Sequence, residues 1–394
     1  MFRTRWFKAT TVTAIVTATV LTGGTAWSAD GRTRSRYSQA QLQSDLDAVT
    51  ATATTDTGAP AVLAEVNIAG RRLRGTSGVR DLDTGGPVDV DGYFRMGSNT
   101  KAFVSVVVLQ LVSEGRLSLD DTVEHWLPGV VSGNGNDGSA ITVRQLLQHT
   151  SGLFDYTDQL LGSIGSLDDY QEFRFHSWTP EQLIAIAMTH APTNAPGAAF
   201  QYSNTNYVLI GQIIKKVTGR DWDREVRDRI IRPLGLRHTF APGNDTVLPE
   251  PHASAYLFFD RETRVETADQ NISWAGAAGA LVTDASDLSR FWSAIGRGAL
   301  LRKAQEKQMR TTVLADEFQE DFPGSRYGLG LGFNPLTCGG GYWTHDGDVA
   351  GFSTKNAVSE DGKTTVVISI SASADTPVQQ AAWTLIDHVL CSRR

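Results

Sequence analysis

FRMGSNTKAFVSVVVLQ, residues 94–110, decides the fold, because in it a serine lies three residues before a lysine at the head of an apolar run. A short extended segment ends just before the serine, and residues 99–112 predict a buried helix. Residues three apart share one face of a helix, so the Lys101 amine can reach the Ser98 hydroxyl. A half-buried lysine loses solvation and its pKa falls, which lets it act as the base that a serine nucleophile needs. On its own, S-x-x-K is more often a surface serine followed by a lysine that reaches solvent.

The bulk composition excludes several classes of function. The chain has 394 residues, 41% of them hydrophobic and 20% charged, which is typical of a globular protein with one or two domains. Its formal net charge is −7 and no run rich in lysine and arginine occurs, so we expect no nucleic acid as a partner. The eight histidines are scattered and form no H-E-x-x-H or Cys/His cluster. We therefore expect neither a metal ion nor another cofactor.

Residues 1–28 are typical of a secretory signal peptide. Three basic residues lie within the first eight, and residues 9–23 form a weakly apolar segment. Small residues at Ala26 and Ser28 favour cleavage after Ser28, with cleavage after Ala26 as the alternative. A membrane anchor is disfavoured because the apolar segment is short and rich in threonine. We therefore expect a soluble, secreted protein without a stable membrane anchor.

The chain has two cysteines, Cys338 and Cys391. In an exported protein two cysteines most often pair. Two buried free thiols are the alternative, because sequence does not show whether the two residues lie close together.

Strand patterns lie near both ends of the chain, and helical patterns fill the middle. The predicted strands cover residues 61–68, 72–79, 327–333, 341–345, 352–358 and 364–372. The predicted helices cover residues 39–52, 99–112, 143–149, 180–189, 205–217, 222–231, 286–295 and 377–390. The strands come in hairpin-like runs, which favours antiparallel pairing.

This arrangement predicts an α/β fold of the α+β kind. An antiparallel sheet is assembled from both ends of the chain and flanked by helices, and an all-helical domain is inserted between them. We place the sheet-plus-helix domain at residues 38–118 and 275–394, and the mainly helical inserted domain at residues 119–274.

Tyr202-Ser203-Asn204 lies in a loop before the predicted helix over residues 205–217. A tyrosine held near a protonated lysine has a lowered pKa and can exchange protons with the serine and the leaving group. Asn204, two residues on in extended backbone, points to the same side, where it can bind a substrate amide and orient the lysine. The alternative is a polar loop whose asparagine caps the next helix.

His345-Asp346-Gly347 lies on a late strand and is followed by Asp348. Gly347 lets substrate backbone lie close against the strand edge. The backbone N–H groups of Asp348 and Ser98 could form an oxyanion hole for a tetrahedral intermediate. The alternative is an ordinary strand-end turn rich in aspartate and glycine.

The order of these motifs resembles the serine β-lactamase and penicillin-binding superfamily: S-x-x-K, then Tyr-x-Asn, then a basic residue-x-Gly on a C-terminal strand. The segment LLQHTSGL, residues 146–153, makes it similar to the branch with class C β-lactamases and exported D-alanyl-D-alanine carboxypeptidases. We expect His149 in this segment to be a structural hydrogen-bonding residue. The resemblance runs from about residue 41 to residue 391.

The resemblance implies a β-lactamase/DD-peptidase-like fold and a role for each site residue. Ser98 is the acylated nucleophile, Lys101 its proton acceptor, and Tyr202 the general acid/base that also serves deacylation. Asn204 and His345 line the site, and His345 helps to hold Tyr202 in its ionised or donor state.

The pattern YGLGL over residues 327–331 looks closest to the carboxypeptidases. Those enzymes also pair a cysteine before the His-x-Gly strand with one in the last helix, as Cys338 and Cys391 would. Because His345 stands where many relatives carry lysine, the carboxypeptidase, D-aminopeptidase and esterase members are nearer than the lactamases proper.

One departure concerns the substrate. In the carboxypeptidases, hydroxyls flank the His-x-Gly glycine and an arginine lies six residues before the cysteine, and together they hold a terminal carboxylate. Here those positions hold Asp346, Asp348 and Gly332. If the two acids face the pocket, they repel a carboxylate and favour esters, amides or substrates with a free amino group.

We therefore expect a secreted serine hydrolase that forms an acyl-enzyme on D-amino-acid-containing peptides, of D-alanyl-D-alanine carboxypeptidase type. The alternatives are a D-stereospecific amidohydrolase, D-aminopeptidase or esterase, a β-lactamase, and a non-catalytic penicillin-binding sensor. The expected partner is a small peptide, amide or ester, cell-wall peptide included.

Overall fold

The computed structural model describes residues 36–51, 59–259, 263–373 and 376–392. The signal peptide that we expect over residues 1–28 lies outside these ranges. Within them, no helix has both the length and the apolar character that crossing a membrane requires.

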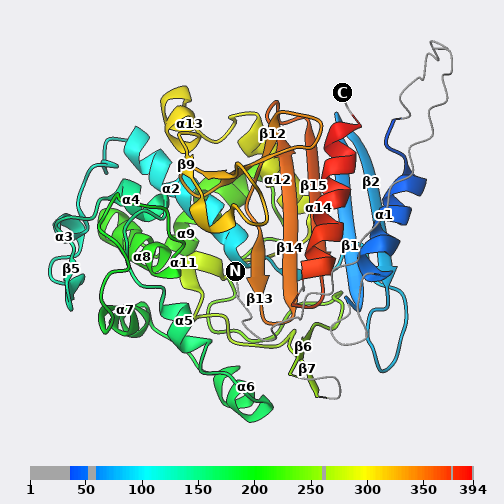
Figure 1. Ribbon diagram of the computed structural model, residues 1–394, viewed down its shortest axis with the longest axis horizontal. Coiled ribbons are helices and arrows are strands. Elements are labelled where there is room, and N and C mark those ends of the chain that lie inside the picture. Colours follow the sequence, from blue (N-terminus) through cyan, green and yellow to red (C-terminus); the bar gives the residue numbers. More distant parts are fainter. Residues whose placement is uncertain (1–35, 52–58, 260–262, 374–375, 393–394) are drawn as a thin grey trace, which may run out of the picture.

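The main sheet joins strands from both ends of the chain (Figure 1). β1 (Ala61–Ile68) pairs antiparallel with β2 (Arg71–Gly78) on one side and with β15 (Thr364–Ile370) on the other. The strand order is β2-β1-β15-β14-β12-β11-β10-β9, and β13 pairs with β14. The other bounds are β9 Val313–Leu314, β10 Arg326–Tyr327, β11 Gly332–Pro335, β12 Gly341–Thr344, β13 Gly347–Val349 and β14 Phe352–Ser359. The predicted α/β fold with an antiparallel sheet is therefore confirmed.

The two faces of the sheet carry different helices, because successive residues of a strand point to opposite sides. Val62 of β1 packs in a core with α1 (Gln39–Ala51) and α14 (Thr376–Cys391). Its neighbour Leu63 belongs to the other core, which includes the apolar side chains of α12 (Ala285–Gly296). Figure 1 shows α14 running along the strands, with α1 beside it.

The remaining helices gather beside the sheet (Figure 1). The two longest of them are α2 (Thr100–Ser113) and α8 (Asn204–Thr218), which contact each other. The others are α3 Val123–Trp126, α4 Val143–Leu147, α5 Tyr156–Leu160, α6 Leu167–Phe173, α7 Pro180–Met188, α9 Trp222–Val226, α10 Arg232–Leu234, α11 Gly276–Gly279 and α13 Lys303–Met309, with a π-helical turn over Arg227–Ile231. Three two-stranded antiparallel sheets join β3 Phe94–Arg95 with β8 Val282–Thr283, β4 Ser132–Gly133 with β5 Asn136–Asp137, and β6 Tyr256–Phe258 with β7 Arg264–Glu266. The domain limits 38–118, 119–274 and 275–394 stay a prediction.

α2 forms the centre of the larger core. Its residues 100–109 are buried without interruption, as expected for a helix that is apolar on all sides. The helix begins at Thr100, after a 3₁₀ turn over Gly97–Asn99, and so starts one residue later than predicted.

The strand predicted over residues 327–333 is interrupted between β10 and β11. Gly330 in the interruption has a positive φ of 83°, which favours glycine. A Cβ at this position would lie 2.0 Å from Ser105 Oγ of α2. The chain leaves the sheet here because it turns close against α2.

The disulfide between Cys338 and Cys391 is present, as predicted. It joins the loop after β11 to the last residue of α14. The same junction contains hydrogen bonds from the backbone N–H and the hydroxyl of Thr337 to the Asp387 carboxylate, at 2.9 and 2.5 Å.

Candidate active site

Ser98 lies in the 3₁₀ turn that leads into α2, and this turn touches β13. Gly97 has a positive φ of 52°, and a Cβ there would lie 2.7 Å from the backbone nitrogen of Asp348. A Cβ on Gly347 would lie 2.0 Å from the carbonyl oxygen of Met96. Glycine is therefore needed at both positions for the turn that carries Ser98 to lie this close to β13. We expected Gly347 to make room for substrate backbone, but the turn that carries Ser98 lies against it instead.

This contact also brings two backbone N–H groups onto neighbouring segments. The Ser98 nitrogen lies 3.0 Å from the position of a Cβ on Gly347, and Asp348 follows directly in β13. A pair of backbone donors beside a nucleophile is the arrangement that an oxyanion hole requires.

Lys101 is fully buried, not half-buried as expected. Its Nζ in the ammonium form donates hydrogen bonds to Ser98 Oγ at 2.9 Å, Asn204 Oδ1 at 2.7 Å and the Ala278 carbonyl oxygen at 2.8 Å. Burial lowers the pKa of Lys101 to about 7, and the Asp155 carboxylate opposes this lowering. At neutral pH a large fraction of Lys101 is therefore an uncharged amine, which can accept the proton of Ser98.

Tyr202 lies beside both groups. Its hydroxyl is hydrogen-bonded to that of Ser98, and its ring centroid lies 4.8 Å from Lys101 Nζ. Burial raises the pKa of Tyr202 well above its ordinary value. The lowered pKa that we expected is therefore wrong in direction: the partly buried ring loses solvation, which disfavours a phenolate and favours the protonated hydroxyl.

Asn204 is the first residue of α8, so it is helical and not in extended backbone as we expected. Its side chain nevertheless reaches Lys101, and its Nδ2 donates to Asp155 Oδ2 at 2.8 Å. Asp155 precedes α5 and was missed from sequence, although it follows the HTSGL motif by two residues.

His345 lies between β12 and β13 and is buried. Its Nδ1 is 2.7 Å from the Asp346 carbonyl oxygen, and its Nε2 is 2.9 Å from the Tyr327 hydroxyl. Burial and the nearby Lys101 lower the pKa of His345 to about 3, so the ring is neutral. The ring centroids of His345 and Tyr202 are 6.3 Å apart, and the hydrogen bond of His345 Nε2 goes to Tyr327. The help that we expected His345 to give Tyr202 stays a prediction.

His149 is structural, as expected. Its Nδ1 is 3.1 Å from the Ser203 backbone nitrogen and 3.1 Å from Asn206 Nδ2. Its ring stacks on Tyr202 with centroids 4.2 Å apart. His149 therefore fixes both the backbone and the ring of the Tyr-x-Asn motif.

Asp346 and Asp348 turn toward Lys355 of β14, a residue that we missed from sequence. Lys355 Nζ lies 3.2 Å from Asp346 Oδ2 and 3.7 Å from Asp348 Oδ2, and its side chain is fully buried. Burial alone would raise the pKa of Asp348, but Lys355 holds it below its ordinary value. Two free acids that repel a substrate are therefore the wrong description, because these acids share a buried cation.

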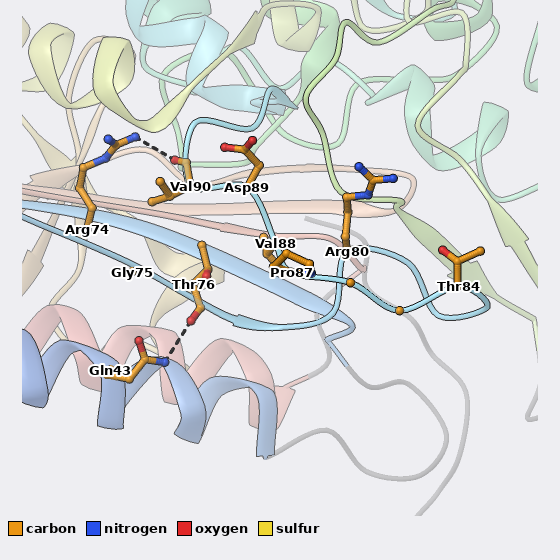
Figure 2. A pocket seen from close by; sticks show the side chains of 12 residues that line it. Gln43, Arg74, Gly75, Thr76, Arg80, Thr84, Pro87, Val88, Asp89 and Val90 are labelled. Carbon is orange, nitrogen blue, oxygen red and sulfur yellow. Dashed lines mark hydrogen bonds between the residues drawn. The ribbon is translucent and has the colours of Figure 1, made fainter.

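A hollow outside this group of residues lies beside α1 and β2 (Figure 2). It measures about 850 Å³ and is lined by α1, β2 and the segment 80–90. Figure 2 shows Gln43 bonded to Thr76 and Arg74 pointing to Val90 on its walls. None of the predicted site residues lines it.

One group of side chains among the described residues could hold a metal ion, His238, Asp284 and Asp287. These three residues already bond one another. His238 Nδ1 is 2.5 Å from Asp284 Oδ2, and the backbone N–H of His238 donates to Asp287 Oδ2 at 2.7 Å. The Asp284 side chain also caps α12.

Comparison with known proteins places this geometry in a family. The Beta-lactamase family model matches residues 46–390, and the chain belongs to that family. The resemblance seen in its motifs is therefore confirmed at the level of the family.

The chain is similar to curated penicillin-binding relatives over part of their length. It is 32% identical to "Penicillin-binding protein 4" of Amycolatopsis lactamdurans over 164 residues, which is 41% of this chain and 40% of that protein. It is 32% identical to "Protein flp" of Staphylococcus aureus (strain MW2) over 41% of this chain and 30% of that protein. The chain thus spans less than half the length of these two proteins.

Two solved structures match over nearly their whole length. The D-stereospecific amidohydrolase from Streptomyces sp. is 40% identical, with a TM-score of 0.79, over 87% of this chain and 98% of that one. The D-amino acid amidase from Ochrobactrum anthropi SV3 complexed with D-phenylalanine is 25% identical, with a TM-score of 0.74, over 89% and 97%.

Proposed function

We propose that the protein hydrolyses the amide bond of D-amino acid amides and short D-aminoacyl peptides through an acyl-enzyme on Ser98. The choice of amides over free acids depends on one observation: Lys355 is already paired with Asp346 and Asp348, the two acids that flank Gly347. The similarity to the D-stereospecific amidohydrolase supports the choice of D-substrates.

Acylation follows from the contacts of Ser98. The neutral Lys101 amine takes the Ser98 proton while Oγ attacks the substrate carbonyl carbon, and the N–H groups of Ser98 and Asp348 stabilise the oxyanion. When the C–N bond breaks, Tyr202 gives its proton to the leaving nitrogen and recovers one from the Lys101 ammonium. The net transfer is one proton from Ser98 to the released amine, and Lys101 and Tyr202 return to their starting protonation states.

Deacylation reverses these transfers with water as the nucleophile. Tyr202 passes its proton to the neutral Lys101 amine as it accepts one from the attacking water, whose oxygen adds to the ester carbonyl. When the ester C–O bond breaks, the proton returns to Ser98 Oγ and the acid is released.

A terminal carboxylate would find little attraction at the leaving-group side. Gly332 replaces the arginine of the carboxypeptidases, and Arg326 is bonded to Thr312 through both its Nε and its Nη2. The carboxypeptidase activity that the sequence predicts is the second candidate, supported by the similarity to penicillin-binding proteins.

Three substrates separate these candidates: D-phenylalanine amide, L-phenylalanine amide and an N-acyl-D-Ala-D-Ala peptide. We expect the highest kcat/KM with the D-amide, and no turnover of any of them by Ser98→Ala. A kcat/KM at least tenfold higher for the peptide acid would instead establish the carboxypeptidase. Rapid loss of a fluorescent penicillin label would indicate a β-lactamase.

We also propose that the protein is secreted. The pattern of residues 1–28 supports export, and so does the disulfide between Cys338 and Cys391, because disulfides persist in oxidising compartments. Expression of the full chain with a C-terminal tag, followed by N-terminal sequencing of the protein from the medium, tests this. We expect mature chains that start at residue 29 or 27.

A further inference from the structure

The side-chain amide of Asn204 is held at both ends. Its Oδ1 accepts a hydrogen bond from Lys101 Nζ at 2.7 Å. Its Nδ2 donates to Asp155 Oδ2 at 2.8 Å and lies 3.2 Å from Thr157 Oγ1. Because an amide has one accepting and one donating end, its partners determine which end faces the lysine.

The end of the Asn204 amide that faces Lys101 determines the direction in which the lone pair on Lys101 Nζ points. A neutral amine has two N–H bonds and one lone pair. The Asn204 Oδ1 and the Ala278 carbonyl oxygen only accept, so they take the two N–H bonds. The lone pair is then left for the Ser98 hydroxyl, 2.9 Å away. An Asn204 amide turned around would place N–H groups there and compete for that lone pair.

We propose that Asp155 is a positioning residue for this base: its carboxylate fixes the Asn204 amide so that the Lys101 lone pair faces Ser98. A carboxylate suits this task because it has acceptors only and cannot bond the Asn204 oxygen. Its second oxygen, Oδ1, accepts the Thr157 N–H at 3.0 Å and caps α5. The inference rests on the acylation step proposed above, but not on the identity of the substrate.

Other bonds hold the backbone around Asn204. The Phe154 carbonyl oxygen accepts from the hydroxyls of Ser203 at 3.3 Å and Thr205 at 2.7 Å. The Tyr156 N–H donates to Thr205 Oγ1 at 3.2 Å. These bonds hold the backbone on both sides of Asn204 without the Asp155 side chain. A substitution of Asp155 is therefore expected to change the orientation of the Asn204 side-chain amide and to leave the start of α8 in place.

Asp155→Asn is the single substitution that tests this role most directly. It keeps one oxygen for the cap of α5, since asparagine is as good an N-cap as aspartate. The atom that faces Asn204 then becomes an NH₂ group, which conflicts with the Nδ2 of Asn204. Turning the Asn204 amide relieves this conflict and presents its N–H groups to Lys101.

The double variant Asp155→Asn/Asn204→Asp restores the order of donors and acceptors. The amide introduced at position 155 donates to one oxygen of the carboxylate introduced at position 204, whose other oxygen faces Lys101. The base is then oriented again, now beside a negative charge that favours the protonated lysine.

The readout is the second-order rate of Ser98 phosphonylation by a fluorophosphonate, followed by intact-protein mass spectrometry from pH 5 to 10. The groups that face Lys101 are Asp155 and His149, His345, and the rings of Tyr202 and Tyr207. Burial lowers the pKa of both histidines below their ordinary value, so the acid limb of the profile reports Lys101.

We expect Asp155→Asn to lower the plateau rate by roughly 10²-fold, the lower end of the range for general base catalysis. Its acid limb should move to lower pH, because the carboxylate raises the pKa of Lys101. The double variant should recover at least tenfold in rate, with its acid limb above that of the wild type.

Asp158→Asn is the matched control, since it removes a carboxylate from the same helix three residues on; it should label like the wild type. A folded Asp155→Asn protein with an unchanged plateau and acid limb would overturn the inference, and so would a double variant no faster than the single one. Normal labelling without hydrolysis of D-phenylalanine amide would overturn the proposed substrate alone.

Discussion

Lys355→Met tests the buried charge cluster that Lys355 forms with Asp346 and Asp348. Methionine keeps most of the length of the lysine side chain but removes the cation that lies 3.2 and 3.7 Å from Asp346 and Asp348. Removing one partner of a buried ion pair costs about 3–5 kcal/mol, because the other charge is left buried. The two carboxylates retain 24% and 19% exposure, so we expect the lower end, about 3 kcal/mol at pH 7.

Thermal unfolding followed by circular dichroism measures this change. For a chain of this size about 3 kcal/mol corresponds to a fall in Tm of roughly 6 °C. Lys363→Met is the control, because that lysine is 63% exposed and lies 3.8 Å from Asp361. Its Tm should stay within about 1 °C of the wild type, as for most exposed ion pairs.

The pH dependence gives the sign of the effect. Without Lys355, burial raises the pKa of both carboxyl groups above their unfolded values, so the variant loses stability wherever these groups are ionised. Its deficit should therefore be largest at neutral pH and shrink as the pH falls and the carboxyl groups take up protons. A Tm that equals that of the wild type at pH 7 would show that the cluster does not stabilise the fold.

The remaining predictions concern the reaction and the disulfide. Ser98→Ala should abolish covalent labelling by a fluorophosphonate while leaving the circular dichroism spectrum unchanged; an adduct in the variant, seen by mass spectrometry, would exclude Ser98 as nucleophile. Tyr202→Phe should fold and lower kcat on D-phenylalanine amide by roughly 10²–10⁴-fold, the usual effect of losing a general acid; unchanged kcat would leave Tyr202 a structural role. The kcat/KM profile should rise with pH through a limb near pH 7, where Lys101 loses its proton; a limb above about pH 9, toward the ordinary range of lysine, would mean that burial does not tune this base. Cys338→Ser should lower the free energy of unfolding by about 4 kcal/mol in the chain-entropy model, since the cysteines are 53 residues apart; equal urea midpoints for variant and wild type would contradict it.

The parts of the fold that could be predicted are those with a local signal. The apolar run after Lys101 predicted the buried helix, and the strand patterns near both ends of the chain predicted the strands from which the sheet is built. The Ser98 to Lys101 contact follows from helical spacing alone. These features depend on neighbours in the sequence, which is why they were found.

The contacts that were missed join distant parts of the chain. Lys355 comes nine residues after Asp346 but reaches it only because β14 pairs with β13. Asp155 meets Asn204 across 49 residues, and no spacing rule connects the two. The pKa of Tyr202 was predicted in the wrong direction because its burial depends on His149 and Phe318, which come from other segments.

A neutral histidine at position 345 is compatible with the burial of Lys101. Lys101 has lost its solvation, and a second ammonium in place of His345 would repel its protonated form and share its hydrogen-bond acceptors. A neutral imidazole avoids both effects, and its Nδ1 and Nε2 are used by the Asp346 carbonyl oxygen and the Tyr327 hydroxyl. Tyr327 is in turn hydrogen-bonded to Tyr207, whose hydroxyl lies 3.0 Å from the Leu147 carbonyl oxygen. The site thus contains one buried group that titrates near neutral pH, and its other polar side chains orient that group without competing for its proton.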